Sequence, residues 1–149
     1  MVKINVCAQV EEFLKTQQYK LTTPRREIIR VLNDAPKPLS IQEIYQQLNE
    51  RPADLASVYR TVNLLCELGV LLKLEFHEKR YRYELSEAFS PHHHHAICRK
   101  CGAIENIFDE CILQTVEERI KRQAGFHVES HILEFYGVCE ECASHSAAQ

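Results

Sequence analysis

The sequence predicts an α+β fold in two modules, a helical front half that ends in a hairpin and a back half rich in cysteine and histidine. Apolar residues recur at helical spacing up to residue 69, two alternating segments follow, and two Cys-x-x-Cys pairs occur after residue 97. With 149 residues, of which 45% are hydrophobic, the chain can bury a core. We place the modules at residues 1–83 and 92–149, with a linker at 84–91.

The formal charge of −3 is unevenly distributed. Residues 1–82 hold 13 Lys and Arg against 10 Asp and Glu, whereas the remainder holds 5 against 11. The first module is therefore suited to a polyanion and the second to cations. Because the sequence has no apolar run of about 18 residues and no apolar block near its start, we expect a cytoplasmic protein that does not enter a membrane.

Three segments of the front half carry helix-start residues followed by apolar residues at helical spacing. In the first, Thr23 is the expected N-cap and is followed by proline. The second opens on a capping box formed by Ser40 and Glu43. The third begins after Asp54 as N-cap and ends at Gly69. We therefore expect three consecutive helices.

The third expected helix leaves hydrogen-bonding side chains outside its buried stripe. They gather near its N-terminal end, from which recognition helices contact bases and phosphates: Ser57, Tyr59, Arg60, Thr61 and Asn63. The segment "LLKLEFHEKRYRYEL" then predicts two strands about a short polar turn. Three helices and a hairpin make a winged helix-turn-helix. Such modules bind DNA or protein, and the positive charge favours DNA.

Four of the seven cysteines form two Cys-x-x-Cys pairs with 37 residues between them: Cys98, Cys101, Cys139 and Cys142. Without an export signal, a disulfide framework is not expected. A single pair can be a redox motif, but two pairs supply the four tetrahedral thiolates of a structural Zn²⁺ site. Gly102 directly after the first pair suits a tight turn.

Four consecutive histidines precede the first cysteine pair. If this segment is extended, His93 and His95 share one face of the strand, and His92 and His94 share the other. Each pair can chelate one ion when further donors complete its shell. The alternative, a solvated surface patch, is less favoured because Cys98 holds the run close to the expected zinc.

Further donors lie in neighbouring segments. Glu84 follows the hairpin and His77 lies within it. The segment "GFHVESHILEFYGV" predicts a strand in which His131 shares a face with His127 and Glu129. The segment before it, from Asp109 as N-cap to Gly125, predicts a helix.

The motifs "LTTPRREIIRVL", "DLASVYRTVNLLCELGV", "YRYELS", "HHHHAICRKCG" and "FYGVCEEC" together resemble the ferric uptake regulator family of bacterial metal-sensing repressors. The resemblance runs from about Lys20 to Cys142. It implies a homodimer held by the second module, a structural zinc on the four cysteines, a regulatory metal near the hinge, and an AT-rich palindromic operator.

Matching the motifs residue by residue implies roles for this chain. Lys20, Tyr59 and Arg60 match residues that contact DNA, and we add Arg25 and Ser57 to this set. Ligands of the regulatory metal match Glu84, His93 and His95. Ligands of a second, more variable site match His92, His94 and His131.

The chain departs from the iron- and peroxide-sensing members at several ligand positions. Pro38 stands where those members usually carry a loop histidine, and Asn106 stands where they carry a carboxylate. Glu105 could replace the latter only if the strand shifted register. At the second site the usual carboxylate falls on Gln114, which leaves as candidates the carboxylates one turn away, Glu110 and Glu117.

These departures bear on which metal is sensed. With His77 as a fourth donor, the regulatory site would be a tetrahedral set of one carboxylate and three imidazoles, which suits Zn²⁺ better than Fe²⁺ or Mn²⁺. We therefore expect a metal-responsive repressor of metal-uptake genes, with zinc favoured over iron or peroxide sensing. A metal-buffering protein and a metalloenzyme are less favoured; the sequence contains no His-Glu-x-x-His and no Gly-x-Ser-x-Gly. We do not expect an enzyme.

Overall fold

The computed structural model describes residues 5–49, 54–76, 80–108 and 113–146. The chain divides into two compact units, Met1–Pro91 and His92–Gln149. Among the described helices none combines the length and the apolar character needed to cross a membrane.

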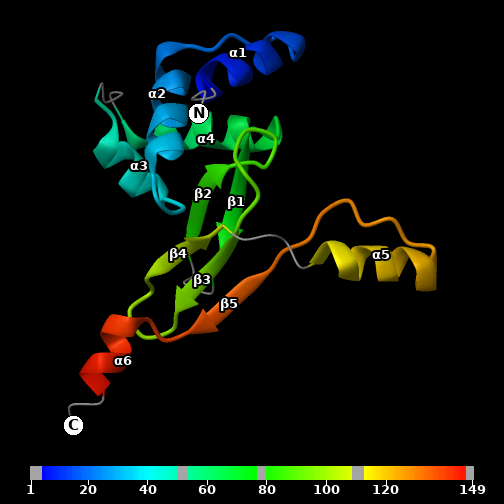
Figure 1. Cartoon of the computed structure of the whole chain (residues 1–149). Helices are drawn as coiled ribbons and strands as arrows, with labels where there is room; N and C mark the ends of the chain where they lie inside the picture. The colour runs from blue at the N-terminus through cyan, green and yellow to red at the C-terminus, as the bar shows by residue number, and fades with distance from the viewer. Residues whose placement is uncertain (1–4, 50–53, 77–79, 109–112, 147–149) are drawn as a thin grey trace. The chain divides into compact units, whose positions relative to one another are not determined.

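The described residues of the first unit form four helices and a two-stranded sheet (Figure 1). Its helices are α1 (Val6–Thr16), α2 (Thr23–Asp34), α3 (Ile41–Gln47) and α4 (Leu55–Glu67). The sheet pairs β1 (Leu71–Glu75) with β2 (Tyr81–Leu85) in antiparallel register. The predicted helices and hairpin are present, and α1 is an additional helix that we did not predict. It buries Val10 and Leu14 in the shared core.

The helix starts of the first unit follow local rules with one correction. Ser40 and Glu43 form the complete capping box, and the Asp54 side chain accepts a hydrogen bond from the Ser57 backbone, as predicted. Helix α2, however, has Thr22 rather than Thr23 as its N-cap, and the Thr22 side chain makes no capping hydrogen bond. The proline then occupies the first turn, where its missing N–H costs nothing.

The hairpin is attached to the start of α3. Leu39 and Tyr83 exchange backbone hydrogen bonds of 3.0 and 2.8 Å. The buried Arg82 guanidinium donates to the Glu43 carboxylate at 3.0 Å and to the Pro38 carbonyl at 3.3 Å. These contacts fix the hairpin on the helical core, as a wing requires.

In the second unit, the part that the structure describes forms a three-stranded sheet with two helices (Figure 1). Its elements are β3 (His94–Cys98), β4 (Ile104–Ile107), α5 (Leu113–Ala124), β5 (Glu134–Gly137) and α6 (Glu140–Ser146). Strand β3 lies in the middle, antiparallel to β4 and parallel to β5. Because a parallel pair needs a long crossover, α5 lies in the connection from β4 to β5.

Two expectations for the second unit need correction or fall outside the structure. The strand predicted for "GFHVESHILEFYGV" forms only over Glu134–Gly137, so His127, Glu129 and His131 precede it in irregular chain. The predicted helix is present as α5 and ends before Gly125, which has φ of 65°. Its expected start at Asp109 lies outside the described residues.

Candidate metal centre and nucleic-acid surface

The four paired cysteines converge at one end of the sheet. Strands β3 and β5 run in parallel, with Cys98 opposite Gly137, so the chain reaches Cys139 two residues beyond the same edge. Cys101 lies in the turn after β3, where Gly102 has φ of 73°, and Cys142 lies in α6. All four sulfur atoms lie within 4.8 Å of one another. This arrangement can enclose one tetrahedral ion.

Hydrogen bonds prepare one of these sulfurs for metal. The Cys139 backbone N–H donates to Cys98 Sγ at 3.3 Å. This donor and the Cys101 backbone N–H lower the pKa of Cys98 to about 6. The thiolate, which is the form that binds metal, is therefore stabilised.

His92, His94 and His131 form a second cluster in the same unit. The ring centroid of His92 lies 4.7 Å from that of His94 and 4.9 Å from that of His131. One ring nitrogen from each lies within 4.8 Å of the others. The sequence pattern predicted the pairing of His92 with His94, and folding adds His131 from the irregular chain before β5.

The chemistry of this cluster fits a metal ion. His94 is buried, and its Nε2 has no hydrogen-bond partner among the described residues. Burial, followed by the charge of His92, lowers the pKa of His94, so its imidazole is neutral and able to bind a cation. Glu117 of α5 lies 2.7 Å from His131 Nδ1. A carboxylate on the second ring nitrogen is the usual partner of a metal-binding histidine.

The other histidine pair consists of His95 in β3 and His93 just before the strand. The ring centroids of His93 and His95 are 5.0 Å apart. His95 is buried and faces Asn106 of β4 across one side and Glu134 of β5 across the other. Glu105 pairs with Ala96 and is exposed, so the register turns its side chain to the face away from His95. The structure thus does not bring Glu105 to this pair.

The remaining predicted donors of the regulatory site belong to the first unit. Glu84 lies in β2 opposite Leu72 and is half-buried. His77 and Glu110 lie outside the described residues. Pro38, at the place of the family's loop histidine, is fully buried.

The predicted DNA-contacting residues lie on α4 and at the start of α2. Tyr59 is exposed on α4, and Arg60 Nη2 donates to Ser57 Oγ at 2.9 Å. The Ser57 hydroxyl in turn donates to the Asp54 carboxylate at 2.8 Å. Ser57 therefore serves the helix cap and holds the Arg60 side chain, a role that helix periodicity alone did not indicate.

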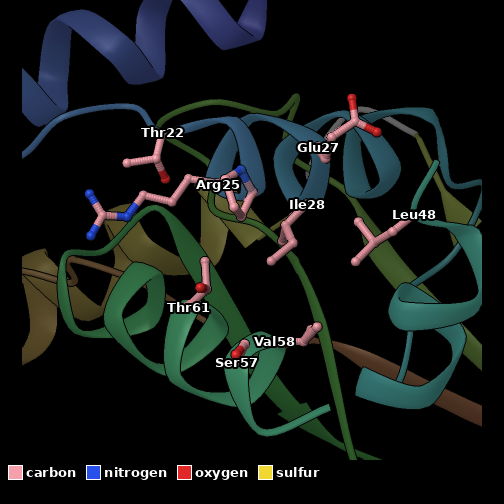
Figure 2. Close-up of a pocket in the computed structure, with 9 residues that line it drawn as sticks. Thr22, Arg25, Glu27, Ile28, Leu48, Ser57, Val58 and Thr61 are labelled. Carbon is pink, nitrogen blue, oxygen red and sulfur yellow. The ribbon is translucent and has the colours of Figure 1, made fainter. Parts of the chain in front are cut away.

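The start of α2 holds a second basic group. The Arg25 guanidinium donates to the Lys20 carbonyl oxygen and lies 5.6 Å from the Tyr19 ring centroid. Arg25 also lines a pocket of about 260 Å³ between α2, the end of α3 and α4 (Figure 2). Its wall includes three buried apolar residues, Ile28, Leu48 and Val58, and three residues with hydroxyls, Thr22, Ser57 and Thr61, together with Pro24 and Glu27.

Comparisons with known proteins agree with this layout. The sequence model of the Ferric uptake regulator family matches residues 16–136. The ferric uptake regulation protein of Bacillus subtilis (strain 168) is 38% identical over 138 residues, which cover 90% of this chain and 92% of that protein.

Solved structures give the same result. The Helicobacter pylori ferric uptake regulator, described as having three functional metal binding sites, superposes with a TM-score of 0.75 at 26% identity, covering 93% of this chain and 91% of that one. A zinc uptake regulator complexed with zinc and DNA superposes with a TM-score of 0.59 at 25% identity, covering 97% and 99%.

A winged helix followed by a small sheet with clustered thiolates and imidazoles defines a metal-responsive, DNA-binding regulator. The chain belongs to the ferric uptake regulator family. Members of this family are transcriptional regulators that bind DNA as dimers, and they are not enzymes. The predicted fold class is confirmed by the mixed helix and sheet structure and by its similarity to these regulators.

Proposed function

We propose that this protein is a cytoplasmic, homodimeric repressor of metal-uptake genes that binds an AT-rich palindromic operator when it carries metal. One observation carries the proposal: β3 and the two residues before it carry two histidine pairs, and the strand ends in a cluster of four cysteines. Soft and borderline donors gathered this closely are the ligands that Zn²⁺ and other transition metals prefer. They are suited to binding ions.

The four cysteines are the proposed structural zinc site. They lie at the end of β3, in the turn after it, directly before α6 and within α6. When bound, Zn²⁺ supplies a tetrahedral cross-link between two segments that are about 40 residues apart in sequence. Cys98 and Cys101 hold the turn after β3, while Cys139 and Cys142 hold the start of α6.

The proposed sensing site consists of Glu84, His93 and His95, with His77 as a candidate fourth ligand. Glu84 is the first residue of the linker 84–91, and the two histidines follow the end of the linker. One ion bound by all three residues would therefore restrict the conformations of the linker. The ion favours operator binding only to the extent that these residues hold it more tightly in the DNA-binding arrangement.

His92, His94 and His131 are the proposed second site, with Glu117 as its carboxylate. The 2.7 Å contact between Glu117 and His131 supports the choice of Glu117 over Gln114, which is exposed. This site lies wholly within the second unit. It can therefore change the stability of that unit without acting on the linker.

Zinc is the favoured signal, and an iron or peroxide signal is the alternative. Pro38 stands where an iron-type site would receive an imidazole, and its buried side chain has no donor atom to offer a metal. Asn106 offers a neutral amide in place of a carboxylate. The alternative is supported by the 38% identical relative, which is named for iron.

DNA binding is assigned to Lys20, Arg25, Tyr59 and Arg60, with Ser57 positioning Arg60. In a dimer, two α4 helices would meet two half-sites of a palindrome, so the operator symmetry would mirror that of the protein. The exposed side chains of Tyr59 and Arg60 and the net positive charge of residues 1–82 support this assignment.

The test is a titration of operator DNA at buffered free Zn²⁺, Fe²⁺ and Mn²⁺, monitored by fluorescence anisotropy. The wild type should bind the operator only above a threshold free concentration of one of the three metals. The variant His93→Ala/His95→Ala should lose that metal dependence while keeping its cysteine-bound zinc. His127→Ala, an exposed histidine outside both clusters, is the matched control. Metal uptake without any metal-dependent DNA affinity would instead identify a metal buffer.

A further inference from the structure

The sheet of the second unit places three polar side chains in one row on one face. Asn106 of β4, His95 of β3 and Glu134 of β5 are directly paired across the three strands. Directly paired residues point to the same face, and adjacent strands lie about 4.8 Å apart. His95 therefore stands between an amide on one side and a carboxylate on the other.

The Glu134 carboxylate is held in place by a neighbour on its own strand. Tyr136, two residues later on the same face, donates its hydroxyl hydrogen to Glu134 Oε2. The Arg99 guanidinium lies 5.5 Å from the centroid of the Tyr136 ring. A half-buried carboxylate anchored in this way has little freedom to turn to solvent, because leaving the row would cost the Tyr136 hydrogen bond.

On the opposite flank of His95, none of the described residues of β4 turns a carboxylate toward it. Asn106 is neutral, and its Oδ1 atom is buried without a hydrogen-bond partner among the described residues. Glu105, the nearest carboxylate in β4, points to the other face. Two neutral imidazoles and Glu84 would leave a divalent ion with a charge of about +1, which is costly to bury unless another anion lies close by.

We infer that Glu134 is a positioning residue of the sensing site: its carboxylate accepts the N–H of the His95 ring nitrogen that does not bind metal, and it supplies the negative charge that Asn106 lacks. This inference rests on the proposed function. The second cluster offers a precedent for such a partner, because Glu117 lies 2.7 Å from His131 Nδ1. A carboxylate partner fixes the tautomer of a metal-binding histidine and makes the ring a stronger ligand.

The test measures metal affinity rather than DNA binding. The full chain with His131→Ala, which disables the second cluster, is titrated with Co²⁺ against a competing chelator while the visible ligand-field bands are recorded. Adding Glu134→Gln should weaken binding roughly 10- to 100-fold and shift those bands. Glu105→Gln removes an equal charge from β4, but on the opposite face of the sheet. It should therefore leave the Co²⁺ affinity and the ligand-field bands unchanged.

Two further variants separate positioning from a purely structural effect. Tyr136→Phe should weaken binding less than Glu134→Gln, because the carboxylate remains but loses its anchor. Adding Asn106→Asp to Glu134→Gln should recover much of the lost affinity, since it returns the charge to the other flank of His95. A defect that only disturbs packing would not be repaired in this way.

The outcomes are distinguishable. Equal affinities for Glu134→Gln and Glu105→Gln would overturn the inference and leave the proposed function standing. A second result would also overturn the inference and leave the proposed function standing. In this result, Glu134→Gln lowers the Co²⁺ affinity together with the cysteine-bound zinc, and Asn106→Asp does not restore the affinity. Absence of any Co²⁺ uptake by the His131→Ala protein beyond the four-cysteine site would overturn the proposed sensing site itself.

Discussion

The two units of this chain are stabilised in different ways. The first has a continuous core in which α1 to α4 and both strands of the wing contribute buried apolar residues, among them Ile28, Ile44, Val62 and Leu65. In the described part of the second unit, only Ile97, Cys98 and Ile104 are buried apolar side chains, and α5 buries none. The first unit can fold on apolar burial, whereas the second cannot.

The second unit instead exposes its large apolar side chains. Ile132 is 82% exposed, Phe108 64% and Phe126 63%. Exposed apolar surface of this extent marks an interaction site in a folded protein. We therefore expect the first unit to be complete as a single chain and the second to depend on bound metal and on a second copy of itself.

The largest expected effect comes from removing the cysteine site. Cys98→Ser/Cys101→Ser should unfold the second unit, because structural zinc can contribute about 10 kcal/mol or more. Circular dichroism during thermal unfolding, together with elemental analysis, should show loss of zinc and of one transition while the first unit still unfolds cooperatively. Cys7→Ser, in the first unit, is the control. A stable, zinc-free dimer would show that the second unit does not depend on metal.

A substitution in the apolar core should destabilise the first unit and leave the zinc of the second unit in place. Ile44→Ala removes a fully buried side chain of the first unit and should lower its free energy of unfolding by about 2 to 5 kcal/mol. Zinc content should not change. Gln42→Ala, exposed on the same helix, should change the urea midpoint little. Equal effects of the two substitutions would contradict the view that α3 is held by apolar burial.

Operator affinity should fall when a DNA-contacting side chain of the first unit is removed. Arg60→Ala should weaken operator binding by about 1 to 3 kcal/mol and relax base preference at one position, with no change in unfolding. Fluorescence anisotropy with operator variants measures both effects. Arg122→Ala removes one positive charge from α5 and is the matched control. If both variants bind equally well, α4 is not the reading helix.

The smallest expected effect tests the exposed apolar face. Ile132→Ser should leave the unfolding of the monomer within about 0.5 kcal/mol but weaken the dimer by about 1 kcal/mol, or roughly fivefold. Sedimentation at several concentrations gives the dissociation constant. Leu72→Ser, a partly exposed leucine of the wing, should not change it. An unaltered dimer in both variants would place the interface elsewhere.

Short-range patterns in the sequence predicted much of this structure. The capping box of Ser40 and Glu43, the cap at Asp54 and the end of α4 near Gly69 are local, because each depends on residues within one or two helical turns. The alternation of the histidine run is equally local. It predicted that His93 pairs with His95 and His92 with His94, and the ring contacts confirm both pairs.

Other features could not be read from local patterns. The alternation around His127 predicted a long strand, but strand pairing with β3 needs hydrogen-bond partners, and β3 extends only from His94 to Cys98. The failure to predict α1 has a similar cause, because its apolar residues gain their stability from the core they join. Intrinsic preference is weak in such segments, and tertiary contacts decide.

The sequence by itself determined the donors: which residues carry sulfur, imidazole or carboxylate, and at what spacing. Only the tertiary structure decided which donors meet. The parallel pairing of β3 with β5 brings Cys139 to Cys98 and Glu134 to His95. The antiparallel pairing of β3 with β4 places Asn106 beside His95 and turns Glu105 to the other face. The physical reason is that strand register is set by contacts between segments distant in sequence, and a shift of one residue would exchange the two faces.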